Sequence, residues 1–456
     1  MLLPDPKYLN PGDNAWQLTA ATLVGLMSIP GLAVLYGGLV EKRWALNSAM
    51  MTFYAFAAVL VVWVLFGFSM GFGQPLHLGP GILSGIVGVP HPVLSSSSIE
   101  GHASIPLLSG VIPSLRFPQS SLIYFQFVFA AISPIILAGA VLGRMSFKAW
   151  MIFVPAWSLL VYSVNAFMLW GGGWLGQLGA VDYSGGYVIH VAAGISGFVA
   201  AAVVGPRLKR RSSVDFRQLL IAVTGAGILW LGWNGFNGGD PYFANADAAG
   251  AVLNTNLATA VALLSWVIMD FWVTNKASLV GAVNGMICGL VAITPAAGYV
   301  NGYGAIAIGV VASVLPWLTM RYLPRLNWFH KVDDTLGVFH THLVAGAIGG
   351  LMTGLLADPR MVEYLGVHGP NSSVAGLFYG NPRLFFVQLL ALLVVVLYDG
   401  LMTWGIMKAI GKIVRLRDNE PIHLLEHQVV SLNDTMVEED LDEPEEEEDE
   451  EFTAGL

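Results

Sequence analysis

Two histidines in apolar, uncharged surroundings are the residues of this sequence best suited to chemistry. Each follows an aspartate by eight residues and precedes two glycines, in the pattern D-x7-H-x3-G-x2-G. The first copy comprises Asp182, His190, Gly194 and Gly197, and the second comprises Asp334, His342, Gly346 and Gly349. A neutral imidazole donates and accepts a hydrogen bond, and its pKa lies near neutrality. The repeated pattern therefore predicts a paired site that binds a small polar solute or relays its proton.

The other ionisable groups in apolar segments give no metal or catalytic pattern. His340 precedes His342 by two residues, so it faces another side of a helix, where a hydrogen bond to a neighbouring helix is the favoured interpretation. A zinc site needs three or four ligands in tetrahedral geometry, and neither Asp270 nor Asp399 has a histidine at such spacing. The single cysteine, Cys288, excludes a disulfide framework. We expect no metal, no cofactor, no enzymatic activity and no nucleic-acid partner.

The two aspartates of the pattern are predicted to cap helices. A carboxylate at the start of a helix accepts hydrogen bonds from free backbone N–H groups and is favoured by the helix dipole. With Asp182 and Asp334 at helix starts, each histidine would lie about two turns into its helix, at roughly 1.5 Å per residue. An electrostatic effect of these acids on a passing cation is a secondary interpretation.

Aromatic residues accompany glycines in two further apolar segments. One contains Phe125 and Phe129, and the other runs from Trp230 through Trp233 to Phe236. Most aromatic residues of a membrane protein serve in packing or in interfacial belts, but aromatic faces also attract cations. These segments are compatible with an entry site for a small monovalent cation.

The composition indicates that a membrane must position these residues. Of 456 residues, 55% are hydrophobic and only 11% are charged, whereas soluble domains carry about 25% charged residues. A spanning helix needs about 20 mostly apolar residues, and eleven segments qualify approximately. They are 14–39, 45–72, 121–142, 149–171, 184–204, 218–237, 250–272, 279–295, 302–320, 336–356 and 384–408. The fold class is therefore an all-α polytopic membrane protein with eleven transmembrane helices.

The basic residues set the predicted orientation. All but four of the 21 Lys and Arg residues fall on one side if the N-terminus is outside and the C-terminus is in the cytoplasm, as the positive-inside rule requires. Residues 1–13 are then extracellular or periplasmic, and no cleaved signal peptide is expected. Residues 411–456 form a cytoplasmic tail whose acidic end, 438–451, is expected to be disordered and accounts for the net charge of −9.

The matched patterns also predict an internal repeat. The two histidine segments open the fifth and tenth predicted spans, and a weaker match joins 131–134 (AISP) to 292–295 (AITP) in the third and eighth. An offset of five spans reverses the direction of crossing, which is the inverted-repeat plan of many transporters. The membrane domain of 14–410 would thus contain repeat one (about 14–204), repeat two (about 218–356) and an eleventh helix (about 384–408).

Several stretches together resemble the ammonium transporter (Amt/Mep/Rh) superfamily across 12–416. They include GDNAWQLTAATLVGLMSIPGLAVLYGG, FQFVFAAISPIILAGAVLGRM, LGWNGFNGG and VDDTLGVFHTH, and the forms around the two histidines are most similar to the Mep-like branch that includes the second plant subfamily. The resemblance implies a homotrimer with one pore per subunit. It assigns the paired pore histidines to His190 and His342, the phenylalanine gate to Phe129 and Phe236, the outer-site tryptophan to Trp170, a second pore tryptophan to Trp233, a conserved acid to Asp182 and a helix-break threonine to Thr294.

Two features depart from the family pattern. The family's outer site often carries a serine where this sequence has Asp240; a carboxylate in the vestibule would attract cations more strongly, but the residue could equally lie in an outer loop. The tail also lacks the family's usual glycine- and histidine-containing docking motif, which leaves regulation by a cytoplasmic partner open.

The resulting hypothesis is an ammonium transporter or channel of the plasma or bacterial inner membrane. Ammonium, with methylammonium as a further candidate, would collect at the outer aromatic site and lose a proton, and ammonia would pass the two histidines, with or without a proton relay. Two alternatives stay open at this point: an ammonium sensor that uses the same fold, and another inverted-repeat secondary transporter driven by an ion gradient.

Overall fold

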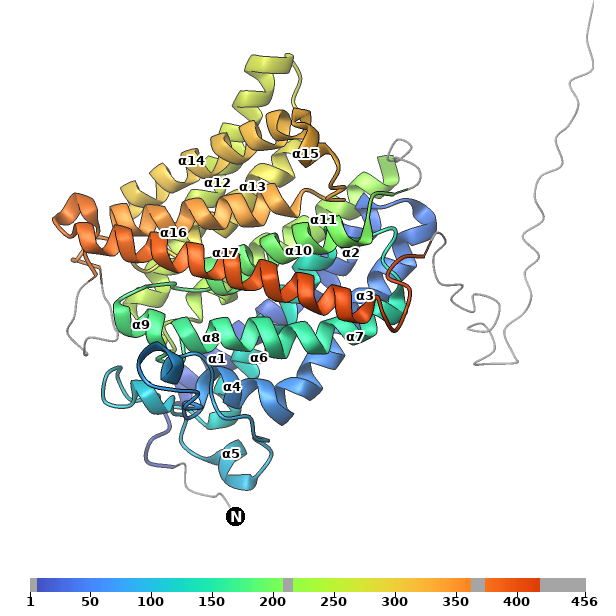
Figure 1. The fold of residues 1–456 in the computed structure, drawn as a ribbon. Helices are drawn as coiled ribbons and strands as arrows, with labels where there is room; N and C mark the ends of the chain where they lie inside the picture. The colour runs from blue at the N-terminus through green and yellow to red at the C-terminus, as the bar shows by residue number, and fades with distance from the viewer. Residues whose placement is uncertain (1–5, 208–215, 362–373, 419–456) are drawn as a thin grey trace, which may run out of the picture. The chain divides into compact units, whose positions relative to one another are not determined.

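Helices make up most of the protein in the computed structural model, which describes residues 6–207, 216–361 and 374–418 (Figure 1). Within these residues, β pairing is limited to isolated bridges. The first ten α-helices are α1 (Pro11–Leu26), α2 (Ala33–Leu39), α3 (Lys42–Val62), α4 (Phe68–Phe72), α5 (Ser96–Glu100), α6 (Gln119–Ala138), α7 (Phe147–Trp157), α8 (Ser163–Leu169), α9 (Trp174–Leu178) and α10 (Ala192–Val204). The remaining seven are α11 (Phe216–Gly238), α12 (Ala246–Thr274), α13 (Leu279–Ile293), α14 (Gly302–Tyr322), α15 (Asn327–His330), α16 (Ala345–Leu356) and α17 (Pro382–Ile410).

Short π-helical turns extend several of these helices. Met27–Leu32 joins α1 to α2, Trp63–Gly67 joins α3 to α4, and Ser158–Tyr162 joins α7 to α8. Gly186–Val191 and Phe339–Val344 lead into α10 and α16. Such turns widen the helix by one residue and occur often at functional sites. Short 3-10 turns lie at Gly81–Gly85, Pro106–Leu108, Leu323–Arg325 and Leu377–Tyr379.

Ten helical stretches in the described part of the chain are long and apolar enough to cross a membrane. They are Pro11–Leu39, Lys42–Phe72, Gln119–Ala138, Phe147–Leu178, Gly186–Val204, Phe216–Gly238, Ala246–Thr274, Gly302–Arg325, Phe339–Leu356 and Pro382–Ile410. Each matches one predicted span. The remaining predicted span, the eighth at 279–295, corresponds to the shorter helix Leu279–Ile293, so its crossing of the membrane stays a prediction, as does the orientation of the termini.

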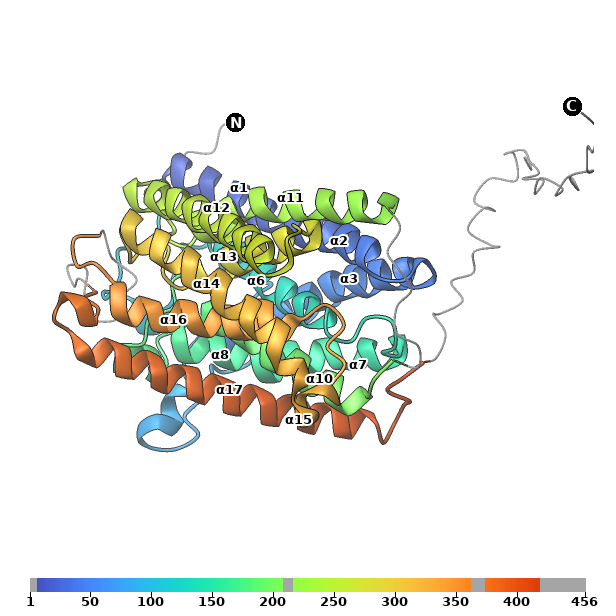
Figure 2. The ribbon, with the colours of Figure 1, turned by 90° about the horizontal axis from the view of Figure 1, so that it is seen from above.

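The helices pack side by side, and α17 lies along α10 and α16 (Figures 1 and 2). Many outward-facing side chains of the long helices are large and apolar; Leu231 is 66% exposed, Leu253 is 68% exposed and Leu401 is 68% exposed. An apolar surface of this extent suits contact with lipid or with other apolar protein surfaces rather than water.

The long segment between α4 and α6 is anchored to the start of the chain. The backbone N–H of Asn10 donates to the carbonyl of Arg116 at 2.8 Å, and the Arg116 guanidinium pairs with Asp13 at 2.7 Å. Asp13 also accepts the backbone N–H of Ala244, in the loop between α11 and α12, at 2.9 Å. This anchoring fixes the loop that carries Asp240.

Some predictions concern residues outside the described ranges. They are the acidic end of the tail at 438–451, the first five residues, and the basic cluster at 209–211 that contributed to the orientation.

Candidate functional site

The two histidines of the repeated pattern meet in the structure. The Nδ1 atoms of His190 and His342 are 3.2 Å apart, and the ring centroids are 5.3 Å apart with an interplanar angle of 30°. A hydrogen bond between these atoms requires an N–H on one ring and a bare nitrogen on the other, so the pair shares one donor and one acceptor. His190 is fully buried, and its Nε2 has no hydrogen-bond partner within the described residues. The pair therefore keeps hydrogen-bonding capacity for a solute.

Each histidine lies in one of the π-helical turns. His190 is in Gly186–Val191, where its N–H donates to the carbonyl of Gly185, five residues earlier, at 3.0 Å. His342 is in Phe339–Val344. The prediction that each histidine lies about two turns into its helix was therefore wrong: both lie close to the helix start. The hydrophobic pattern gave no sign of the widened turns, because they depend on packing between distant segments.

The glycines of the pattern allow the two histidine helices to approach closely. A Cβ atom on Gly194 would collide with the backbone nitrogen of Leu343, next to His342. A Cβ atom on Gly346 would lie 2.9 Å from the carbonyl of Gly186 and 3.3 Å from Cβ of His190. Each glycine thus receives the histidine segment of the other copy, and a side chain at either position would force the histidines apart.

The aspartates bind free N–H groups at the helix starts, as predicted. The Asp182 carboxylate accepts four backbone hydrogen bonds, from the N–H groups of residues 185 to 188, over 2.6 to 3.1 Å. The Asp334 carboxylate accepts two, from Val338 at 3.0 Å and Phe339 at 2.8 Å. Both acids precede the formal helix start by several residues and reach forward to it, so they hold the turns that present the histidines.

Aromatic rings form a row that leads to the histidines. The Phe129 ring lies 6.3 Å from Trp170 and 4.6 Å from Phe236, and the Phe236 ring lies 5.8 Å from His190. Phe125 packs on Phe129 at 4.8 Å. The three phenylalanines are fully buried, whereas Trp170 is only partly buried. The rings of Phe129 and Phe236 therefore fill the space between Trp170 and the His190 imidazole.

The remaining predicted pore residues hold the row in place. The Trp233 ring stacks on His190, with centroids 5.3 Å apart, and its Nε1–H donates to the Thr294 hydroxyl at 2.9 Å. That hydroxyl donates to the carbonyl of Leu290 at 2.7 Å. On the other side, Nε1–H of Trp170 donates to the carbonyl of Asp182 at 2.7 Å. The indole positions are thus fixed by the segments that carry the repeated sequence pattern.

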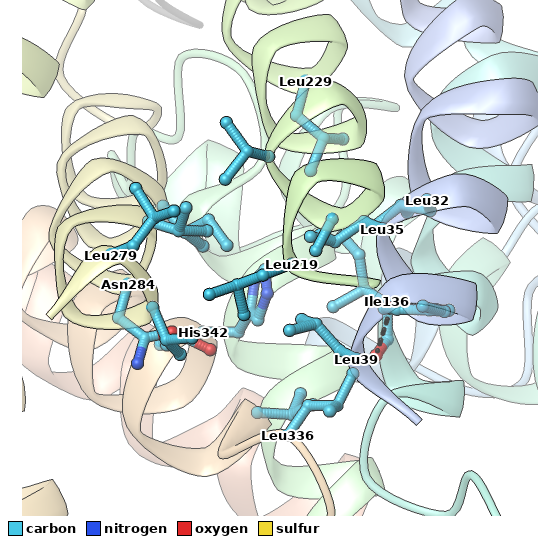
Figure 3. Close-up of a pocket in the computed structure, with 18 of the residues that line it drawn as sticks. Leu32, Leu35, Leu39, Ile136, Leu219, Leu229, Leu279, Asn284, Leu336 and His342 are labelled. Carbon is cyan, nitrogen blue, oxygen red and sulfur yellow. Dashed lines mark hydrogen bonds between the residues drawn. The ribbon is translucent and has the colours of Figure 1, made fainter. Parts of the chain in front are cut away.

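An apolar cavity is lined by His342 and by side chains of α2, α11 and α13. Figure 3 shows leucine side chains from α2, α11 and α13 pointing towards it, with His342 at its edge. Trp233 also lines it. A second cavity adjoins the first, because both are lined by Leu39 and Asn284, and this second cavity includes charged groups such as Asp333. From His342 towards Asp333, the lining of these two cavities thus changes from apolar to polar.

The structure places Asp240 beside the aromatic row, although it belongs to the loop after α11. Its side chain is only 4% exposed. It adjoins Ser184, whose hydroxyl donates to the carbonyl of Phe236 at 2.7 Å. Asp240 is thus both in a loop and buried near the predicted gate, and sequence alone left these two alternatives open.

The other ionisable residues of the apolar segments lie elsewhere. Nδ1 of His340 contacts the Thr319 hydroxyl at 2.9 Å, and the imidazole lines the second cavity. Asp399 accepts both of its hydrogen bonds, at 2.9 and 2.8 Å, from the Nδ2 amide of Asn165. Asp270 accepts one from Nε1–H of Trp317 at 2.8 Å. Among the described residues, no group of three or more His, Cys, Asp or Glu side chains is placed to hold a metal ion.

Sequence reasoning missed the buried arginine that ties together the opposite end of the protein. Arg144 is 1% exposed and donates to the carbonyls of Gly205, Ala140 and Asp333 and to the hydroxyl of Thr335. Burial lowers the pKa of Arg144 to about 10, and Asp333 opposes that shift, so the guanidinium stays charged at neutral pH. The positive-inside count contained Arg144, but nothing in its neighbourhood distinguished it from the exposed basic residues.

Comparisons with known proteins identify the family of this chain. The family model for the Ammonium Transporter Family matches residues 15–430. Ammonium transporter 3 member 2 of rice (Oryza sativa subsp. japonica) is 50% identical over 425 residues, covering 90% of this chain and 86% of the relative. Ammonium transporter 2 of Arabidopsis thaliana is 50% identical over 382 residues, covering 83% and 78%.

Solved structures have the same fold. Mep2 of Saccharomyces cerevisiae, at 28% identity, matches with a TM-score of 0.76 and covers 90% of this chain and 88% of its own. A protein described as a sensor Amt protein, at 24% identity, matches with a TM-score of 0.74 over 89% and 95%. Members of the matched family are multi-pass membrane transport proteins rather than enzymes. The chain belongs to the ammonium transporter family.

Proposed function

We propose that the protein conducts ammonia derived from ammonium through a pore that runs along the aromatic row and past the histidine pair. The observation that carries this proposal is the unbroken sequence of rings from Trp170 through Phe129 and Phe236 to His190 and His342, followed by an apolar cavity. The row offers π faces for a cation at its outer end, and His190 offers an imidazole nitrogen without a hydrogen-bond partner among the described residues.

The apolar lining favours a neutral solute over an ion. A charged group at the centre of a membrane costs several kcal/mol or more, and no ionised partner lines the cavity that begins at His342. Loss of a proton removes most of that cost from ammonium. K+ has a similar size but no proton to lose, so the same pore excludes it.

Each predicted residue has a place in the proposed path. Ammonium is attracted to the faces of Trp170 and Phe129 by cation–π interaction. Rotation of the Phe129 and Phe236 rings opens the way inward. Ammonia then donates to and accepts from the imidazoles of His190 and His342, whose tautomers are complementary. Trp233 stacks on His190 and holds its imidazole at the proposed path.

The proposal includes the architecture around the pore. Eleven helices with an inverted five-plus-five repeat are supported by the reciprocal packing of Gly194 on Leu343 and Gly346 on Gly186. The N-terminus would lie outside and the C-terminus in the cytoplasm. Three copies would assemble with one pore each, and a cytoplasmic regulator would act on the tail. Cysteine-accessibility mapping at Lys7 and Lys412 tests the orientation.

Uptake of ammonium by proteoliposomes that contain only this protein tests the function. The wild-type protein is expected to take up NH4+ and exclude K+, and His190→Ala or His342→Ala is expected to lose rate, selectivity or both. Variants that keep the full rate and the full selectivity of the wild type would contradict the proposed path.

A sensor is the second candidate, because the fold is shared with a protein described as a sensor Amt protein. Growth on limiting ammonium, with this chain as the sole transporter, separates the two. Robust uptake without a signalling response supports transport alone, and a response without uptake supports sensing.

A further inference from the structure

Asp240 has an unused hydrogen-bonding atom in a buried position. Its side chain is 4% exposed, and its Oδ2 has no hydrogen-bond partner within the described residues. Buried polar atoms almost always have a partner, and an unpartnered carboxylate oxygen is especially costly. The atom therefore requires a ligand that donates a hydrogen bond, or a proton of its own.

The surroundings place this carboxylate at the aromatic row. Ser184 adjoins it and donates to the carbonyl of Phe236 at 2.7 Å. Gly239, the preceding residue, packs so closely on Phe125 that a Cβ atom there would lie 2.5 Å from the ring. Asp240 therefore follows a residue that packs on Phe125 and adjoins a serine that is bound to the backbone of Phe236.

Other oxygen atoms that can accept a hydrogen bond, but that have no donor among the described residues, lie near Asp240. The hydroxyl of Tyr162 and Oε1 of Gln126 are buried and have no hydrogen-bond partner among the described residues. Nε2 of Gln126 donates to the Tyr242 hydroxyl at 2.9 Å, and both tyrosines interact electrostatically with Asp240. Ammonium carries four N–H donors and no acceptor, so it matches a region where oxygens lack donors. An anion would be repelled from it.

The neighbouring acid cannot take the same role. Both oxygens of Asp182 are occupied by four backbone N–H groups. Accepting a proton there would break bonds that hold the first turn of the His190 helix. Asp240 makes no such bonds, so its free oxygen can gain a proton without disturbing the backbone.

We propose that Asp240 is the base that takes the proton from ammonium at the outer end of the pore, an inference that rests on the proposed transport function. One N–H bond of ammonium breaks, its electron pair stays on nitrogen, and an O–H bond forms on the Asp240 carboxylate. The products are ammonia and a neutral carboxylic acid, so two buried opposite charges disappear together. The acid then gives its proton to water on the outer side, which restores the carboxylate for the next ammonium.

The electrostatic setting favours this transfer. Burial raises the pKa of Asp240 well above its usual range, the adjoining Ser184 hydroxyl opposes that shift, and the charge of Asp182 adds to it. The titratable groups that face the carboxylate are Asp182, Tyr162 and Tyr242, and none of them is a cation. A carboxylate in this setting gains more from a proton than one in water.

Initial rates of NH4+ uptake by Asp240→Asn proteoliposomes, measured against concentration and external pH, test the proposal. Asparagine keeps the size and polarity but cannot accept a proton. The maximal rate is expected to fall on the order of 100-fold, a usual contribution of a positioned base, while KM changes little because the aromatic faces remain. The wild-type rate is expected to fall as external pH drops through the Asp240 pKa, and this dependence is expected to disappear in the variant.

Asp247→Asn is the matched control, because Asp247 is also a buried acid, 4% exposed, in the first turn of α12. It is expected to keep the maximal rate and the pH dependence of the wild type. If Asp240→Asn raises KM but leaves the maximal rate unchanged, Asp240 only attracts the cation and the proposal is wrong. Unchanged kinetics would overturn it as well.

Asp240→Glu decides the matter if the asparagine variant does not fold. A glutamate keeps the base but moves it, so a folded variant with partial rate and a shifted pH profile supports the proposal, and an unshifted profile overturns it. Failure of the wild-type protein to transport ammonium would instead refute the proposed function. This outcome is separate from failure of the Asp240 proposal, because it is seen in the wild-type protein without any variant.

Discussion

Replacement of Asp182 by asparagine is expected to destabilise the protein strongly. The two carboxylate oxygens accept two backbone N–H groups each, from Gly185 and Gly186 on one and from Tyr187 and Val188 on the other. Asparagine replaces one oxygen by an amide nitrogen, which is a donor, so two buried N–H groups lose their acceptor. At about 1 to 3 kcal/mol for each unsatisfied group, the free energy of unfolding falls by roughly 2 to 6 kcal/mol.

Asp334→Asn provides a graded comparison because Asp334 holds the equivalent position in the second copy. Each of its oxygens accepts one backbone N–H group, from Val338 or Phe339. The same substitution leaves only one group unsatisfied, and the expected loss is roughly 1 to 3 kcal/mol. Asp182→Asn should therefore be the more damaging change of the two.

Thermal unfolding of the purified proteins in detergent measures both losses, with NH4+ over K+ selectivity as the second readout. The Asp182 variant is also expected to lose selectivity, because Tyr187 and Val188 lie three and two residues before His190 in the same turn. An Asp182→Asn protein that unfolds at the wild-type temperature, or at a higher temperature than Asp334→Asn, would refute the reasoning from hydrogen-bond counts.

Three further predictions concern other contacts. Arg144→Met should lower the free energy of unfolding by about 3 kcal/mol or more, because it leaves several buried acceptors unpaired, and denaturation followed by intrinsic fluorescence would detect this. Gly194→Ala should impair folding or transport through its clash with Leu343, whereas Gly227→Ala, which meets open space, should not; equal behaviour in expression and uptake assays would contradict the close crossing. The third prediction concerns Asp333: partial burial alone would raise the pKa of its carboxyl, but hydrogen bonds from Arg207 lower this pKa to about 2. This contribution to stability is present above the unfolded value of 3.8 and is lost as pH falls towards 2, and acid titration of Asp333→Asn should lack that loss.

Much of the fold could be predicted from local sequence patterns. Ten of the predicted spans match helices that are long and apolar enough to cross a membrane, because the thickness of a bilayer fixes the length of an apolar run. The predicted break between the spans at 279–295 and 302–320 also matches the turn between α13 and α14, which contains Pro295 and Gly298. The repeated spacing predicted that His190 and His342 belong together.

The sequence by itself determined the residue types of the site. The site contains histidines, phenylalanines, tryptophans and acids, and the neighbouring residues in the sequence indicate what chemistry each of them could perform. Ionisable groups are costly in an apolar segment, and for this reason His190, His342 and Asp182 stand out from their sequence neighbours alone.

Only the tertiary structure decided how those residues meet. His190 and His342 are 152 positions apart, and a distance of 3.2 Å between their Nδ1 atoms depends on a helix crossing that no local pattern encodes. The π-helical turns, the closed phenylalanine pair and the burial of Asp240 likewise arise from packing between distant segments. Apolar length specifies that a helix forms in the membrane, but side-chain volumes and hydrogen-bond partners across the bundle specify which face it turns inward and how closely it approaches its neighbours.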